Sequence, residues 1–247
     1  MEIREIQDSK ELEKELSNKR VLGIDETGVG DYFSPLVAAI AIVPENNLEK
    51  LLNLGVKDSK KLSDKKIQEI AKEIKEKDLV KFKVSHISPK GYNNMTKQNN
   101  ANEIKTFVHL KAFKEAKFSI KANDFDCVLI DQYSTSTAVE GYLEKWFDPK
   151  MKWAGFKKIN KPIYLTYQAE SKHISVAVAS IMARDFLINK MKEYSALYGV
   201  DLPLGASEDV KQFAINFIKK NTSSEKEQNM LKYEIMKNFK LEDKREE

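Results

Sequence analysis

The stretch that decides the fold is VLGIDETGVGDYFSPLVAAIAIVP, residues 21–44. Two apolar runs, 21–25 and 36–44, stand on either side of a turn that contains glycine and proline. Two such runs around a short glycine-bearing turn predict a β-hairpin. Because the second run is almost entirely apolar, we expect it to form a central strand that is covered on both faces.

The rest of the chain alternates between helix-like and strand-like patterns. Ser63 is a candidate N-cap for a helix over residues 62–77, and residues 79–88 alternate like a half-buried strand. The further expected elements are an asparagine-rich loop at 93–102, a helix at 103–121, a strand at 125–133, an irregular segment at 134–160 with a short helix at 141–147, a strand at 162–170, and helices at 172–198, 208–220 and 225–240. This order predicts an α/β fold with a mixed central β-sheet flanked by helices and with extra C-terminal helices.

Composition excludes several protein classes. The chain has 247 residues, of which 41% are hydrophobic and 32% charged, so it is long enough to bury a core and is unlike a disordered chain. Its one cysteine, Cys127, permits no internal disulfide and favours a reducing compartment. The charged N-terminus is unlike a signal peptide, and no apolar run is long enough to span a membrane. We therefore expect a cytoplasmic protein without membrane contact.

The net charge of +4 comes from 42 basic and 38 acidic residues, and residues 57–83 hold ten lysines against six acids. A small excess is weak support for a polyanionic partner, and a lysine run before a helix is usually a solvated face. The alternative is that Ser59, Lys60 and Lys61 hold phosphate oxygens together with backbone N–H groups.

Acidic residues follow the apolar runs of three predicted strands. Asp25 and Glu26 end the first, Asp131 ends another, and Glu170 ends a third. Neighbouring strands would bring these carboxylates to one edge, where they repel each other unless a hard cation such as Mg²⁺ offsets their charge. This arrangement indicates metal-dependent phosphoryl chemistry, and scattered turn acids in solvent remain the alternative.

The turn Gly28–Val29–Gly30 allows a close backbone approach to a ligand, although a plain hairpin turn explains it equally well. It matches neither a dinucleotide fingerprint nor a phosphate-binding P-loop. The three histidines form no zinc-binding spacing, and Cys127 in an apolar strand is a poor nucleophile.

Four segments together resemble the type 2/type 3 ribonucleases H, and most closely ribonuclease HIII. They are IDETGVGDYFSPLVAA (24–39), VKDSKKLS (56–63), LIDQY (129–133) and AESKHISVAVASIMARD (169–185). Glu170 before Ser-Lys-His resembles the type 3 enzymes, since the type 2 enzymes usually carry aspartate there. Asn100 and Asn102 resemble the family's N-x-N helix start, and LPLGAS (202–207) resembles a downstream family segment.

The resemblance implies an RNase H-like fold and hydrolysis of the RNA strand of RNA/DNA hybrids, which leaves 5′-phosphate and 3′-hydroxyl ends. It assigns catalysis and the binding of one or two Mg²⁺ or Mn²⁺ ions to Asp25, Glu26, Asp131 and Glu170. It assigns substrate binding to Gly28, Val29, Gly30, Ser59, Lys60, Lys61, Asn100 and Asn102. The implied division is a charged lead-in at 1–20, a catalytic domain at 21–220, and a helical extension at 221–247 packed on or near it. We expect a monomer without an obligate protein partner.

Two departures from the resembled family bear on the expected substrate affinity. The family usually carries lysine or arginine between the two glycines, where this chain has Val29, and a glycine where it has Ser34. Type 3 enzymes usually carry an N-terminal substrate-binding domain, whereas 24 residues precede Asp25 here. We therefore expect a form without that domain, with weaker affinity for hybrids.

Four other interpretations stay open at this point. The first is a type 2-like enzyme that cuts at single ribonucleotides in DNA. The second is a non-catalytic module that binds hybrids, although all four acids are present. The third is another nuclease or strand-transfer enzyme with the same fold. The fourth is a structural α/β protein, which predicts no stabilisation by metal.

Overall fold

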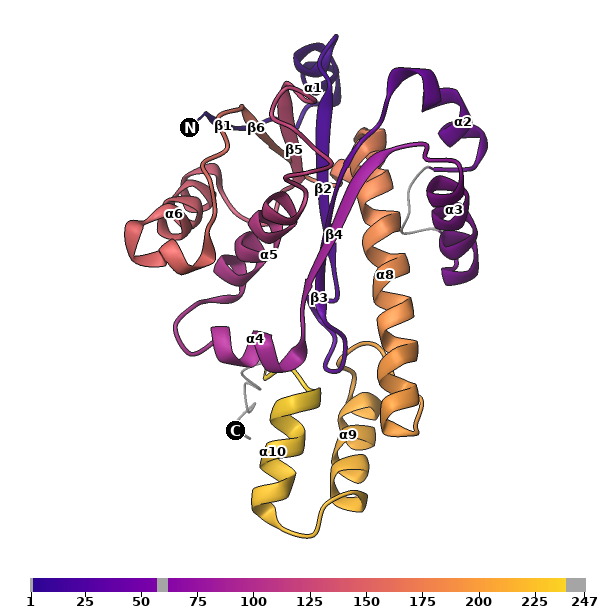
Figure 1. The fold of residues 1–247 in the computed structure, drawn as a ribbon, viewed down its shortest axis with the longest axis vertical. Helices are drawn as coiled ribbons and strands as arrows, with labels where there is room; N and C mark the ends of the chain where they lie inside the picture. Colours follow the sequence, from indigo (N-terminus) through magenta and orange to yellow (C-terminus); the bar gives the residue numbers. More distant parts are fainter. Residues whose placement is uncertain (1, 57–61, 239–247) are drawn as a thin grey trace.

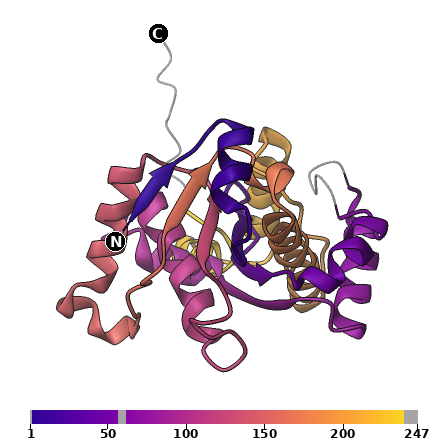
Figure 2. The same cartoon turned by 90° about the horizontal axis from the view of Figure 1, so that it is seen from above.

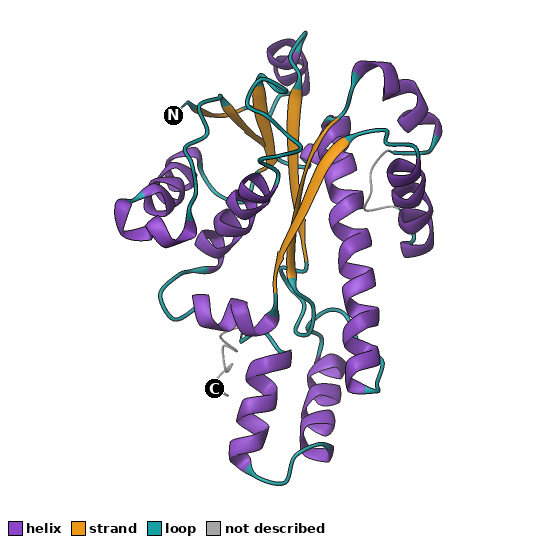
Figure 3. Cartoon of the chain, in the orientation of Figure 1, coloured by secondary structure: helices purple, strands orange, loops and turns teal. Residues whose placement is uncertain are grey.

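The computed structural model describes residues 2–56 and 62–238. In these residues the strands form one mixed sheet with the order β1-β6-β5-β2-β3-β4 (Figure 1; Figure 3). β2 pairs with β3 and β3 with β4 in antiparallel fashion, and the other neighbours are parallel. The strands are β1 Ile3–Glu5, β2 Val21–Thr27, β3 Leu36–Ile42, β4 Lys81–Ile87, β5 Cys127–Asp131 and β6 Ile163–Thr166.

Helices cover both faces of this sheet. α8 packs across β2 and β3 on one face, with α3 behind it, and α5 covers the other face beside α6 (Figure 1; Figure 2). The α-helices are α1 Ser9–Leu16, α2 Leu48–Asn53, α3 Asp64–Glu76, α4 Pro89–Met95, α5 Ala101–Glu115, α6 Ser136–Phe147, α7 Ala169–Lys172, α8 Ile174–Tyr198, α9 Glu208–Lys220 and α10 Glu225–Ile235, with 3₁₀ turns at Glu45–Asn47 and Pro149–Ala154. The predicted layered α/β architecture is confirmed.

The predicted hairpin and its central strand are also confirmed. β2 and β3 pair from Leu22↔Ile42 to Thr27↔Val37, and every residue of β3 is buried. Gly23 lets α8 approach β2 closely, because a Cβ atom there would lie 2.4 Å from the backbone of Ser175. The hairpin therefore positions Asp25 and Glu26 in the middle of the molecule.

Residues 2–20 contain a strand and a helix, whereas the sequence predicted only a charged lead-in there. β1 adds to the sheet beside β6, and α1 buries Leu12 and Leu16 in a cluster with residues of β5 and β6. Asp8 caps α1 by accepting a hydrogen bond from the Glu11 N–H (2.8 Å). A strand of three residues is too short to show a periodic pattern, whereas the i, i+4 spacing of Leu12 and Leu16 was an available signal.

Local caps account for the other differences from the sequence prediction. Pro89 starts α4 behind the Ser88 cap, so the expected loop at 93–102 is partly helical. Thr135 caps α6, which begins before the predicted residue 141. β6 ends at Thr166, and Gln168 adopts a left-handed φ of 54° before α7.

The C-terminal helices α9 and α10 lie together beyond the turn that joins β2 and β3 (Figure 1). α10 packs against α4 and ends at Ile235, earlier than the predicted residue 240. Ile235 at the end of this helix is buried, and so are Met236 and Lys237 after it. No helix in the described ranges is long and apolar enough to cross a lipid bilayer.

Candidate active site

Two acidic residues meet where β2 and β5 run side by side. These strands are parallel and in register up to Ile24↔Ile130. The next residue on each strand is an acid, Asp25 on β2 and Asp131 on β5. The register therefore brings the two side chains to the same position across the sheet, as the sequence predicted.

Asp25 faces α8 and is almost completely buried, with 8% of its surface exposed. Ser180 of α8 donates a hydrogen bond to its carboxylate. Burial raises the pKa of Asp25 to about 8, and the negative charges of Glu26 and Asp131 add to the effect. Asp25 therefore favours its protonated form more than an ordinary aspartate does, unless a cation offsets the neighbouring charges.

Glu26 points to the opposite face of the sheet, because successive strand residues alternate. Its Oε1 lies 2.8 Å from Lys105 Nζ, and its Oε2 accepts a hydrogen bond of 2.9 Å from His109 Nε2. Burial opposes the ionisation of Glu26, but the His109 hydrogen bond and the nearby cation hold its pKa at about 2. The pKa values of these two adjacent acids are thus shifted in opposite directions.

The residues that hold Glu26 are themselves packed around Tyr133. The Lys105 ammonium lies 4.8 Å from the centre of the Tyr133 ring, and the His109 ring meets it edge to face. The Tyr133 hydroxyl is 2.8 Å from Thr106 Oγ1, which fixes the ring. Lys105 and His109 were not predicted as site residues, although their i, i+4 spacing puts them on one helix face.

Glu170 belongs to α7 and not to the end of a strand, which corrects the predicted strand at 162–170. It is buried, with 4% of its surface exposed. The preceding residue connects it to the other acids, because the Ala169 N–H donates to Asp131 Oδ1 (3.0 Å). Lys172 Nζ donates to Thr166 Oγ1 (2.8 Å) and ties the short helix to the end of β6.

The acids near the C-terminal ends of β2 and β5 suit a hard divalent ion, since their donor atoms are carboxylate oxygens. Asp25, Glu26 and Asp131 are close enough for their charges to perturb one another. In the described part of the chain, however, no three acid, histidine or cysteine side chains already surround one point. Glu26 is turned toward Lys105 and His109, so metal binding requires its carboxylate to rotate or to share these contacts.

The glycine turn lies directly after these acids. Gly28 has a φ of +81°, and a Cβ atom there would lie 2.2 Å from the Pro35 carbonyl oxygen. Glycine is therefore required at this position on both conformational and steric grounds. Val29 is 39% exposed, and a Cβ atom on Gly30 would meet nothing within 4 Å.

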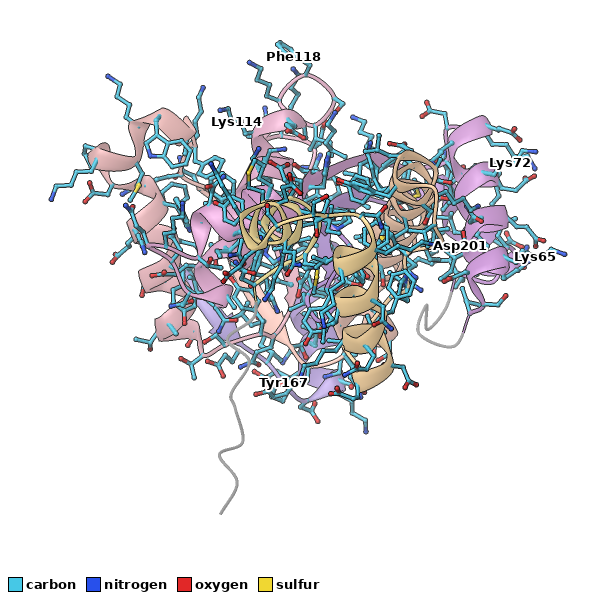
Figure 4. The ribbon with its side chains drawn as sticks, turned by 90° about the horizontal axis from the view of Figure 1, so that it is seen from below. Lys65, Lys72, Lys114, Phe118, Tyr167 and Asp201 are labelled. Atoms are coloured by element: carbon cyan, nitrogen blue, oxygen red, sulfur yellow. The ribbon has the colours of Figure 1, made fainter. Side chains whose placement is uncertain are left out.

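The other predicted substrate-binding residues are only partly described. Ser59, Lys60 and Lys61 lie outside the described residues. Asn100 is the N-cap of α5 in a reciprocal capping box with Glu103, and Asn102 lies in the first turn of this helix. Of the other lysines in residues 57–83, Lys65 and Lys72 project outward from α3 (Figure 4).

Comparison with known proteins gives one consistent family. The family profile described as Ribonuclease HII matches residues 22–237. Ribonuclease HIII of Leuconostoc mesenteroides is 32% identical over 85% of this chain and 66% of its own length. The enzyme of Phytoplasma mali is 35% identical over 89% of this chain and 70% of its own length. The Bacillus mycoides enzyme is 33% identical over 81% of this chain and 61% of its own length, so the chain spans roughly two thirds of such relatives.

Solved structures agree with this match. Bst-RNase HIII in complex with Mn²⁺ superposes with a TM-score of 0.78 at 28% identity, covering 94% of this chain and 70% of that one. A point mutant of the same enzyme superposes with a TM-score of 0.76 at 28% identity, covering 91% of this chain and 67% of that one. Aquifex aeolicus RNase H3 superposes with a TM-score of 0.62 at 27% identity, covering 89% of this chain and 75% of that one.

Proposed function

Because the chain belongs to the ribonuclease HII family, among relatives named ribonuclease HIII, we propose that it is an endoribonuclease that hydrolyses the RNA strand of RNA/DNA hybrids. The observation that carries the proposal is the register Ile24↔Ile130, which aligns Asp25 with Asp131. Glu26 follows on the same strand, and Glu170 follows the residue that donates to Asp131. Four buried or half-buried acids at one edge suit phosphodiester hydrolysis better than a purely structural role.

Asp25, Glu26, Asp131 and Glu170 would hold one or two Mg²⁺ or Mn²⁺ ions. When bound, such ions lower the pKa of a water and stabilise negative charge on the phosphate. The protein supplies the fixed geometry: Ala169 orients Asp131, Ser180 orients Asp25, and Lys105 with His109 keeps Glu26 ionised. The expected products carry 5′-phosphate and 3′-hydroxyl ends.

The glycine turn and the start of α5 would bind the substrate on either side of the acids. The N–H groups of the Gly28–Val29–Gly30 turn would bind the 2′-hydroxyl groups that distinguish RNA from DNA. Asn100 and Asn102 offer amides to sugars or phosphates, as do Ser59, Lys60 and Lys61 from the basic segment. We expect the protein to act as a monomer in the cytoplasm, which sedimentation of the purified protein and cell fractionation would test.

A cleavage panel tests this proposal. Duplexes with one, four and many ribonucleotides are incubated with Mg²⁺ or Mn²⁺, beside a plain DNA duplex. The proposal predicts cleavage of the RNA strand, fastest for the long ribonucleotide stretch. Equal rates on the single-ribonucleotide duplex would indicate type 2 behaviour, binding without cleavage a non-catalytic module, and cleavage of plain DNA a different nuclease.

A further inference from the structure

A lysine from the C-terminal segment is buried beneath the glycine turn. Lys237 is 1% exposed, although lysine is seldom fully buried. Its ammonium nitrogen donates to the Gly28 carbonyl oxygen and lies 3.4 Å from Ser34 Oγ. It also lies 5.9 Å from the centre of the Tyr92 ring. A residue 209 positions away in the sequence therefore contacts the backbone of the turn.

The segment that carries Lys237 is held on both sides. The Lys237 N–H donates to the Tyr32 carbonyl oxygen (2.8 Å), inside the loop that contains the glycine turn. On the other side, Asn93 Nδ2 donates to the carbonyl oxygens of Tyr233 (2.9 Å) and Met236 (2.6 Å). The Asn238 N–H donates to Asn93 Oδ1 (2.6 Å). These contacts hold the backbone on either side of Lys237, which places its side chain beneath the glycine turn.

A polar chain extends from the lysine to a carboxylate. Ser34 Oγ donates to Asp31 Oδ2 (2.7 Å), and Asp31 Oδ1 accepts from the Gly205 N–H (2.8 Å). Burial lowers the pKa of Lys237 to about 7, while the Asp31 charge opposes that effect. Both protonation states of an amine keep N–H donors, so the contact with the Gly28 carbonyl does not depend on the charge.

The direction of the Gly28 carbonyl determines where the next N–H points. The C=O and N–H groups of a planar trans peptide point in opposite directions. Since the Gly28 carbonyl is directed inward to Lys237, the Val29 N–H is directed away from the buried lysine. The Gly28–Val29 peptide adjoins a glycine with a φ of +81°, where the backbone has more freedom to turn than at other residues.

We propose that Lys237 is a positioning residue for RNA recognition, which holds the Gly28–Val29 peptide so that the Val29 N–H faces the ribose of the bound RNA strand. This inference rests on the proposed function and adds a specificity-determining residue to it. Burying an amine is costly unless it is hydrogen-bonded, and the backbone carbonyl of the recognition turn provides that bond. The turn has an apolar side chain, Val29, at its centre, so recognition there depends on the backbone.

The test compares the dissociation constants of an RNA/DNA hybrid and a DNA duplex of the same sequence, both in Ca²⁺ to prevent turnover. Lys237→Met keeps the length of the side chain and removes its donor. We expect this variant to reduce the preference for the hybrid about fivefold, the worth of one hydrogen bond. Ser34→Ala, which removes only the neighbouring hydroxyl, should also reduce the preference for the hybrid, but by a smaller factor. This second variant provides the test if Lys237→Met does not fold.

Tyr233→Phe is the matched control, because Tyr233 lies shortly before Lys237 in the chain and its hydroxyl donates to Asn94 of α4 and not to the glycine turn. It should keep the full preference. The inference is overturned if Lys237→Met keeps the wild-type preference, or if Tyr233→Phe loses as much as Lys237→Met, since a general loosening of the segment would explain that result. If the wild-type protein itself shows no preference for the hybrid, the proposed function fails first, and that outcome is distinguishable from the other two.

Discussion

At the scale of single residues, the site shifts the pKa values of two adjacent carboxylic acids in opposite directions. Asp25 is buried against α8 and shifts to a pKa of about 8, while Glu26 contacts Lys105 and His109 and shifts to a pKa of about 2. The alternation of side chains along β2 is the cause, because it places the two acids in different environments. The protein therefore controls the charge at the site before any cation binds.

His173 gives a residue-scale prediction with a defined pH window. Burial lowers the pKa of His173 from 6.5 to about 4, and its Nδ1 accepts from the Ser175 N–H (3.2 Å) at the start of α8. Between pH 4 and 6.5 the unfolded chain binds the proton and the folded protein does not, so stability rises with pH across this window.

We therefore expect the free energy of unfolding of the wild-type protein in urea to fall relative to that of His173→Asn as the pH is lowered from 6.5 toward 4. His173→Asn keeps an N-cap side chain and removes the titrating group, whereas Asp25, whose raised pKa has the opposite effect on stability, titrates in both proteins. The same pH slope in both proteins would contradict the assignment to His173.

The four acids could be predicted from the sequence because each stands at the end of an apolar run or inside a segment that resembles a known family. The residues that control them could not. Glu26 and His109 are 83 positions apart, and Gly28 and Lys237 are 209 apart. Such contacts depend on how helices pack on the sheet, which a pattern within one segment does not contain.

At the scale of elements, long periodic segments were predicted well and short ones were missed. The continuous apolar run of β3 and the helix spacing of α3 and α8 identified these elements. The three residues of β1 and the four of α7 are stabilised by their neighbours and carry too few positions for a pattern. The missed helix α7 matters most, because it carries Glu170.

Leu12 tests whether α1 is part of the fold. Its side chain is buried in a cluster with residues of β5 and β6, with 2% of its surface exposed. We expect Leu12→Ala to lower the free energy of unfolding by about 2–4 kcal/mol, because it leaves a cavity under α1. Urea denaturation measures the change, and Lys10→Ala on the exposed side of the same helix is the control. Equal stability of the two variants would mean that α1 does not pack as described.

Asn100 has a structural role in α5 and a predicted role in substrate binding, and two substitutions separate them. Asn100→Ala should cost about 1 kcal/mol of stability through the lost cap. Asn100→Asp keeps a capping oxygen but replaces the amide with a negative charge, so stability should hold while affinity for the hybrid falls. Unchanged affinity in the aspartate variant would remove Asn100 from the substrate-binding set.

At the scale of the whole molecule, bound divalent cations would make the charge more positive than +4. The reason is that they would offset the negative charges of the site acids, which the value of +4 includes. A divalent ion at free concentration ~tenfold above its dissociation constant should stabilise the folded protein by about 1.4 kcal/mol. For a chain of this size that corresponds to a melting temperature about 3–5 °C higher. Mg²⁺ should produce this rise, EDTA should reverse it, and NaCl at the same ionic strength should not reproduce it.

The most direct test of the central claim is cleavage of a labelled RNA/DNA hybrid in Mg²⁺ by the wild-type protein and by Asp131→Asn. We predict that the RNA strand is cut by the wild-type protein, and that the substitution lowers the rate on the order of a thousandfold without lowering the melting temperature. Asp126→Asn, at the other end of the β5 segment and paired with Arg20, should keep the wild-type rate. Equal cleavage by the wild-type and Asp131→Asn proteins would contradict the assignment of the active site to this edge of the sheet.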